Sequence, residues 1–167
     1  MVASINLLGT YKYFIFTALL FSLFGDIFLM LPDKFLHGLI SFFIAHLLFL
    51  VAFIFLGNSF TWWLAVIFIF AGLFLYKYLF SYLGKMKISV LLYVSIIFAM
   101  AWRAWENYYL IGSTATLMIA IGTILFIISD TNIALNKFRK RYKSAEAIIL
   151  STYFASIWLL SLSLNYF

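Results

Sequence analysis

The chain has 167 residues, of which 67% are hydrophobic and only 10% charged. Soluble domains carry about 25% charged residues, so this composition excludes a soluble globular protein and indicates an integral membrane protein. With no cysteine, the chain has no thiolate catalysis, disulfides or cysteine-ligated metal sites. The net charge of +6 comes from basic residues that gather at segment ends, so we attribute it to membrane topology and expect no nucleic-acid partner.

Six segments are long and apolar enough to cross a bilayer as helices, which takes about 20 residues each. In chain order they cover residues 11–31, 36–56, 61–80, 87–109, 112–136 and 145–165. The short connections between them predict antiparallel neighbours in one bundle. We therefore expect an all-α polytopic bundle in which residues 1–167 form a single transmembrane helical domain.

The basic residues distinguish the two ends of this bundle. Antiparallel threading puts nine of the eleven Lys and Arg residues at one end, leaving only Lys12 and Arg103 at the other. The nine are Lys34, Lys77, Lys85, Lys87, Lys137, Arg139, Lys140, Arg141 and Lys143. Since cytoplasmic loops are enriched in Lys and Arg, we expect this end in the cytoplasm and both termini on the non-cytoplasmic side.

Two aspartates lie inside predicted spans, where a carboxylate is costly and usually functional. Asp26 precedes Pro32 by six residues, which places it roughly 9 Å above the cytoplasmic end of its helix. Asp130 precedes Lys137 by seven residues, or roughly 10 Å. The two carboxylates are therefore expected in one layer. Repulsion there would keep one protonated and one ionised near neutral pH, the arrangement that acid–base chemistry needs.

Other polar residues are predicted near the same layer. We expect substrate-binding roles for Ser22, His46, Asn132 and Tyr153. The alternative for each is an interhelical hydrogen bond, which is common between membrane helices.

A zinc site is the alternative to this interpretation. Asp26, Asp130 and His46 are the only plausible zinc ligands at this depth. We favour a site with no metal and no cofactor.

Two charged features lie away from this layer. Arg103 and Glu106 are three residues apart on one predicted helix, which favours an ion pair near the outer surface. The basic run over residues 137–143 is mainly a topology determinant, but it could also hold a lipid phosphate directly below Asp130.

Two blocks of the sequence resemble a known family. The first covers residues 21–47 and contains Gly25-Asp26, and the second covers residues 129–155 and starts at Ser129-Asp130. In order and spacing, both blocks resemble the YhhN family of lysoplasmalogenase-like membrane proteins. The family typically has additional helices before the Gly-Asp motif, a difference that bears on substrate range more than on chemistry.

The resemblance implies a hydrolase that cleaves the vinyl ether of lysoplasmalogens, releasing a fatty aldehyde and glycerophosphoethanolamine or glycerophosphocholine. The motif aspartates of the family fall on Asp26 and Asp130, and its motif histidine falls on His46. The expected partners are a lysophospholipid substrate and the surrounding membrane lipid. The oligomeric state is not indicated.

Hydrolysis of a vinyl ether is chemistry that two aspartates can perform. A vinyl ether hydrolyses by protonation of its β-carbon, and water then attacks the oxocarbenium ion. One carboxylic acid can supply the proton while an ionised partner stabilises the cation and activates the water. The sequence does not assign Asp26 and Asp130 to these two roles.

Two other classes of function remain open. A proton-coupled transporter would also use intramembrane Asp and His residues, although the sequence has no inverted repeat or pair of broken helices. A purely structural role is the other. The richness in Phe, Ile, Tyr, Asn and Lys is typical of an AT-rich genome, so we expect a bacterial inner membrane.

Overall fold

The computed structural model describes the backbone of residues 2–57 and 59–167, and their side chains from residue 9 onward. Six α-helices each have the length and composition of a membrane span. They are α1 (Val2–Met30), α2 (Phe35–Leu56), α3 (Trp62–Leu79), α4 (Lys87–Ile111), α5 (Thr114–Ala134) and α6 (Ala145–Ser163). The all-α fold and the six spans are confirmed.

Some helix boundaries differ from the prediction. α1 begins at Val2, nine residues before the predicted start, because the preceding residues contain no proline to stop the helix. α5 begins at Thr114, since Gly112 adopts a left-handed φ of 68° that ends α4. Ser113 then caps α5 by accepting a hydrogen bond from the Thr116 N–H.

The end of α5 continues in an unexpected form. Residues Leu135–Arg139 make a π-helical turn, η3, which carries the chain past the predicted end at residue 136. Two short 3₁₀ turns, η1 (Phe80–Tyr82) and η2 (Gly84–Met86), connect α3 to α4.

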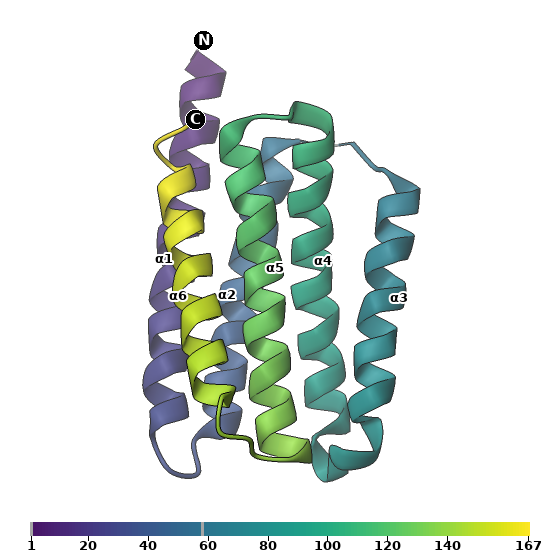
Figure 1. Cartoon of the computed structure of the whole chain (residues 1–167). Coiled ribbons are helices and arrows are strands. Elements are labelled where there is room, and N and C mark those ends of the chain that lie inside the picture. The colour runs from purple at the N-terminus through teal and green to yellow at the C-terminus, as the bar shows by residue number, and fades with distance from the viewer. Residues whose placement is uncertain (1, 58) are drawn as a thin grey trace.

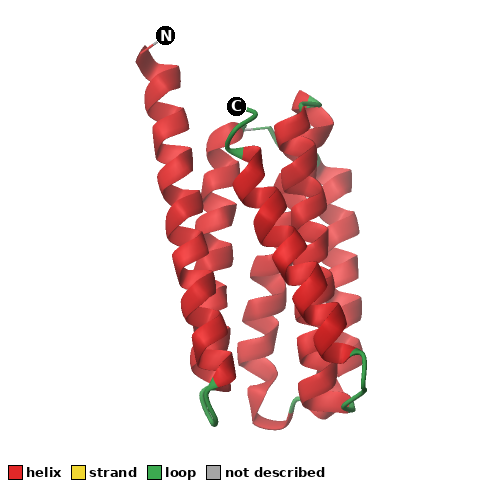
Figure 2. Cartoon of the chain, turned by 60° about the vertical axis from the view of Figure 1, so that its left-hand side comes forward, coloured by secondary structure: helices red, strands yellow, loops and turns green. Residues whose placement is uncertain are grey.

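Helices α2, α4 and α5 form the centre of the bundle (Figure 1). α2 packs against α1 and α4, and α5 packs against α4 and α6, while α3 lies on α4 at the edge. α1 and α6 meet through few contacts. Figure 2 shows that the N-terminal end of α1 extends beyond its neighbours.

The closest helix pair depends on glycine. A methyl group at Gly25 would lie 2.6 Å from the ring of Phe42, and one at Gly38 would lie 2.7 Å from Leu29. Small residues of this kind let membrane helices approach closely. The Ser41 hydroxyl also donates to the Phe21 carbonyl across this interface at 2.7 Å. α1 is therefore fixed on α2 beside Asp26.

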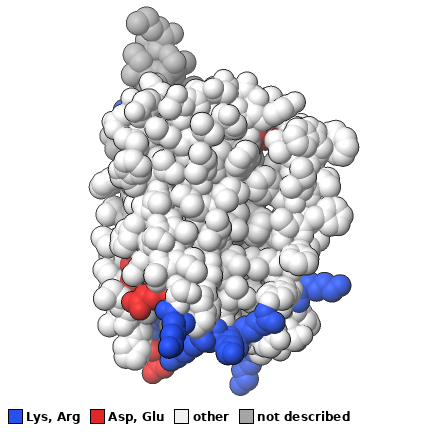
Figure 3. All heavy atoms as spheres, in the orientation of Figure 1, with Lys and Arg blue, Asp and Glu red and all other residues white. Residues whose placement is uncertain are grey.

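The sides of the bundle expose apolar side chains that suit a lipid environment, and one end of the bundle carries most of the charged side chains. Large apolar side chains such as Phe70 and Ile88 are exposed along the helices. Lys and Arg gather at the lower end in Figure 3, where the α1–α2, α3–α4 and α5–α6 connections lie. The helix order thus brings the nine basic residues to one end, and the assignment of that end to the cytoplasm stays a prediction.

The opposite end holds a buried ion pair. Arg103 donates to the carboxylate of Glu106, as predicted, and both side chains are buried. The reason is that the pair binds the connection between α2 and α3. Arg103 also donates to the carbonyls of Gly57 and Ser59, and Glu106 accepts from the Thr61 N–H.

Candidate active site

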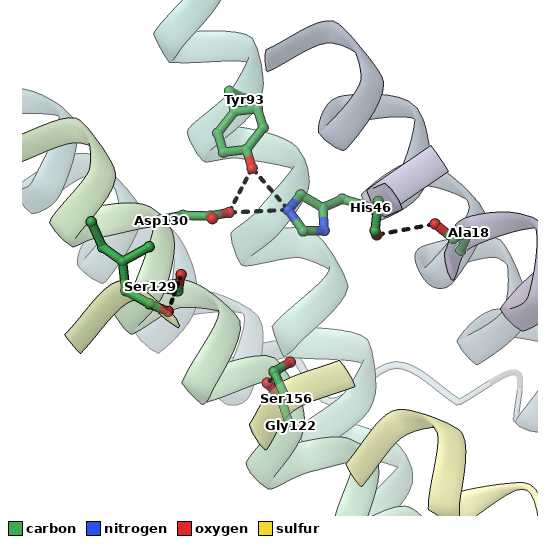
Figure 4. Close-up of polar contacts among 9 residues, drawn as sticks. Ala18, His46, Tyr93, Gly122, Ser129, Asp130 and Ser156 are labelled. Carbon is green, nitrogen blue, oxygen red and sulfur yellow. Dashed lines mark hydrogen bonds and ion pairs between the residues drawn. The ribbon is translucent and has the colours of Figure 1, made fainter. Parts of the chain in front are cut away.

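Three buried side chains from three helices meet at one carboxylate oxygen, which belongs to Asp130. The hydroxyl of Tyr93 on α4 donates to Oδ2 of Asp130 on α5 at 2.5 Å. Nε2 of His46 on α2 lies 3.1 Å from the same oxygen and 3.0 Å from the Tyr93 hydroxyl. Figure 4 shows the three side chains pointing toward one another. Each lies on the inward face of its helix, so the packing of α2, α4 and α5 assembles the cluster.

A separate pair of polar side chains joins α1 and α6. The hydroxyl of Tyr153 on α6 donates to Oδ2 of Asp26 on α1 at 2.6 Å. Tyr153 is buried and Asp26 is half-buried. This bond bridges α1 and α6, which otherwise make few contacts.

Two phenylalanine rings lie between the cluster and the pair. The ring of Phe42 is centred 6.5 Å from the His46 ring and 6.0 Å from the Tyr153 ring. The ring of Phe126 is centred 5.0 Å from His46 and 5.6 Å from Tyr153. Both polar groups therefore share the same aromatic neighbours.

Two of the predicted substrate-binding residues do not reach either carboxylate. The hydroxyl of Ser22 is buried and donates to the Ala18 carbonyl one turn earlier. The amide of Asn132 donates to the Ile128 carbonyl and accepts from the Tyr142 hydroxyl. Both side chains donate hydrogen bonds to backbone carbonyls of their own helix, as Ser and Asn often do. A substrate contact by either one stays a prediction.

Sequence reasoning missed Tyr93. The chain has 11 tyrosines, so residue type alone does not select it. Its depth in the membrane could have selected it. Tyr93 follows Lys87 by six residues, which places it roughly 9 Å from the basic end of its helix. That is the depth predicted for Asp26 and Asp130.

An apolar cavity of about 50 Å³ opens beside the cluster. Asp130, Tyr93 and Thr131 are polar residues in its wall, and the rest of the wall is apolar, including Leu39 and Phe98. Such a volume has room for at least one water molecule, which the Asp130 and Tyr93 oxygens would hold. The site thus combines a carboxyl group, a phenol and an imidazole with an adjoining cavity whose wall is mostly apolar.

The residues weighed as zinc ligands are divided between the two polar groups. Asp130 pairs with His46, whereas Asp26 pairs with Tyr153. Across the described residues, no three His, Cys, Asp or Glu side chains gather closely enough to hold a metal ion.

Comparison with known proteins identifies the family. A family model described as the YhhN family matches residues 1–164. The chain belongs to the YhhN family. The resemblance of the two motif blocks is therefore confirmed, and this YhhN family member is an integral membrane protein with six apolar spans.

Several curated relatives are similar to this chain. Lysoplasmalogenase TMEM86A of Bos taurus is 37% identical over 155 residues, covering 89% of this chain and 64% of the relative. Lysoplasmalogenase TMEM86B of Sus scrofa is 34% identical over 158 residues, covering 94% of this chain and 66% of the relative. The membrane protein YhhN of Escherichia coli O6:H1 is 26% identical over 155 residues, with 92% and 74% covered.

The chain thus spans slightly less than two thirds of the length of these two mammalian relatives. No solved structure matches it.

Proposed function

We propose that this member of the YhhN family is a membrane-embedded lysoplasmalogenase, which hydrolyses the vinyl ether of a lysoplasmalogen to a fatty aldehyde and a glycerophospho-ethanolamine or -choline. Similarity to relatives named lysoplasmalogenase supports the reaction. The observation that carries the proposal is the buried Asp130 carboxyl, bound by Tyr93 and His46 at the wall of an apolar cavity.

The reaction begins with a proton transfer to carbon. The β-carbon of the vinyl ether takes a proton from a carboxylic acid, and the electron pair of the C=C bond forms the new C–H bond. Water adds to the resulting oxocarbenium ion and loses a proton to a base. The hemiacetal then expels the glycerol oxygen, which is protonated as it leaves, and the aldehyde is released.

Asp130 is the carboxyl group placed to meet the substrate in this scheme. It lines the cavity, and Tyr93 and His46 fix its Oδ2. A charge on the oxocarbenium ion would be stabilised there, because the mostly apolar surroundings screen it little. Asp26, held by Tyr153, is the second proposed catalytic carboxylate.

We further propose that the basic end faces the cytoplasm, in the inner membrane of a bacterium. The gathering of Lys and Arg at one end supports the orientation. A lysolipid with its headgroup at that surface carries its ether bond a short way into the bundle, toward the aspartate layer.

The test is aldehyde release by the purified protein from a lysoplasmalogen. Asp130→Asn and Asp26→Asn are each expected to lower the rate by about 10²- to 10⁴-fold, the usual contribution of a positioned acid or base. Glu146→Gln, on the exposed start of α6, is the control that should keep the rate. If no vinyl-ether lipid releases aldehyde and proteoliposomes instead show uptake driven by a pH gradient, the transporter replaces the hydrolase.

A further inference from the structure

A second hollow opens at the basic end of the bundle. Its volume is about 560 Å³, and it lies where the end of α1, the start of α2, η3 and the connection to α6 come together. Its polar lining residues are Asp33, Asn136, Lys137 and Arg141. The hollow therefore carries both signs of charge, unlike the apolar cavity beside Asp130.

The charged groups of this hollow are not paired with one another. Among the described residues, neither Lys137 nor Arg141 forms an ion pair, and the same is true of Asp33. The ammonium of Lys137 lies 4.9 Å from the centre of the Phe35 ring, which leaves its hydrogen-bond donors free for an anion. Asp33 sits in a turn with a left-handed φ of 62°, a conformation that Asp tolerates better than most residues. Asp33 thus adds a carboxylate to a wall that also carries two cations.

The hollow adjoins the apolar cavity. Leu29, Phe35 and Ile133 line both. Lys137 lies seven residues after Asp130 along α5 and η3, or roughly 10 Å toward the basic end. This spacing suits a glycerol backbone whose phosphate lies at the surface and whose ether oxygen points into the bundle.

We propose that this hollow binds the zwitterionic headgroup of the substrate, with Lys137 and Arg141 holding the phosphate and Asp33 holding the ammonium group. The inference rests on the proposed hydrolysis of a lysoplasmalogen and names the residues that select its headgroup. Arg and Lys both suit phosphate, and Arg can bind two of its oxygens at once. The carboxylate makes the hollow more favourable for phosphoethanolamine or phosphocholine than for a bare phosphate.

Binding can be measured without turnover. The probes are three saturated ethers of one chain length, which carry no vinyl bond and are not hydrolysed: a 1-O-alkyl lysophosphoethanolamine, the corresponding 1-O-alkyl glycerophosphate and the 1-O-alkyl glycerol. Their dissociation constants are measured with the full chain in phospholipid-free detergent. The wild type is expected to bind the phosphoethanolamine ether most tightly and the alkyl glycerol about ten- to a hundredfold more weakly.

The variants separate the two halves of the headgroup. Lys137→Gln combined with Arg141→Gln is expected to remove most of the advantage of both phosphate-bearing ethers over the alkyl glycerol. Asp33→Asn is expected to remove only the preference for phosphoethanolamine over bare phosphate. The charge-preserving pair Lys137→Arg and Arg141→Lys should keep phosphate binding. Lys140→Gln combined with Lys143→Gln, on the same connection but outside the hollow, is the matched control and should change nothing.

The outcomes distinguish this inference from the proposed function. Equal binding of all three ethers by the wild type, or full headgroup discrimination by the Lys137 and Arg141 double variant, overturns the headgroup site even if aldehyde is released from a lysoplasmalogen. Equal competition by a two-chain phosphatidylethanolamine also overturns it, because the hollow would then hold ordinary bilayer lipid. Headgroup discrimination without any aldehyde release supports the site and contradicts the hydrolase.

Discussion

At the scale of single residues, the candidate site depends on one oxygen. Oδ2 of Asp130 meets the Tyr93 hydroxyl and Nε2 of His46 within 3.1 Å. All three side chains are buried, so bulk water does not readily replace these partners. Hydrogen bonds to a buried charged group contribute more than neutral ones, and losing one leaves the carboxylate less well held.

Removal of the Tyr93 hydroxyl should therefore impair catalysis. Tyr93→Phe keeps the ring and its contact with His46 but deletes the donor to Asp130. We expect kcat for aldehyde release to fall about ten- to a hundredfold, since a charge-assisted hydrogen bond contributes about 1.5–3 kcal/mol.

Tyr109→Phe is the control, because that ring is 60% exposed and lies toward the opposite end of α4. An unchanged kcat in Tyr93→Phe would show that Asp130 acts without this phenol.

The residues of the site were predictable to different degrees. Asp26, Asp130, His46 and Tyr153 follow from helix direction and depth, because charged and polar groups in a span must find partners inside the bundle. The division into two polar groups was not predictable, since it depends on how far each helix is rotated. Depth does not give rotation, and the aromatic pair that separates the groups is visible only in the packed structure.

At the scale of helices, the two ends of α4 contact different parts of the structure. Tyr93 serves the candidate site, whereas Arg103 and Glu106 hold the connection between α2 and α3. The sequence predicted this ion pair from its spacing. It could not predict the burial of the pair, because the partners in the connection come from more than forty residues away.

Breaking this ion pair should cost stability rather than chemistry. Arg103→Gln leaves the buried Glu106 carboxylate without its cation, and removal of one partner of a buried pair typically costs about 3–5 kcal/mol. The free energy of unfolding, measured by denaturant titration in micelles, should fall by that order while kcat per folded molecule is kept. Lys12→Gln, an exposed cation of α1, should leave both unchanged. A loss of kcat with full stability would contradict a structural role.

Local backbone form was the least predictable feature of the helices. The π-helical turn at Leu135–Arg139 arises at the end of an apolar span that composition alone would continue as an α-helix. This turn carries Lys137 into the headgroup hollow. π-helical turns often occur at functional sites.

At the scale of the whole molecule, composition and the alternation of basic connections were sufficient to predict the bundle and the gathering of basic residues at one of its ends. Six spans put both chain ends at the same end of the bundle, and the structure agrees (Figure 1). The expectation that residues 1–167 act as one domain stays a prediction, as does the direction of insertion.

The direction of insertion can be tested because the chain has no cysteine. Single variants Lys140→Cys, in the connection before α6, and Asn165→Cys, after α6, place one exposed thiol at each end of the bundle. A membrane-impermeant maleimide should label Asn165→Cys in right-side-out vesicles and Lys140→Cys only in inverted ones. The opposite labelling pattern would put the headgroup hollow on the outer face.

The central claim is that a carboxylic acid protonates the carbon of a vinyl ether. The most direct measurement is the mass of the fatty aldehyde released from a lysoplasmalogen by the wild-type protein in D₂O. The mechanism predicts one deuterium on the carbon next to the carbonyl, above the level in aldehyde incubated alone for the same time. Aldehyde with no deuterium there, or no aldehyde at all, would contradict the claim.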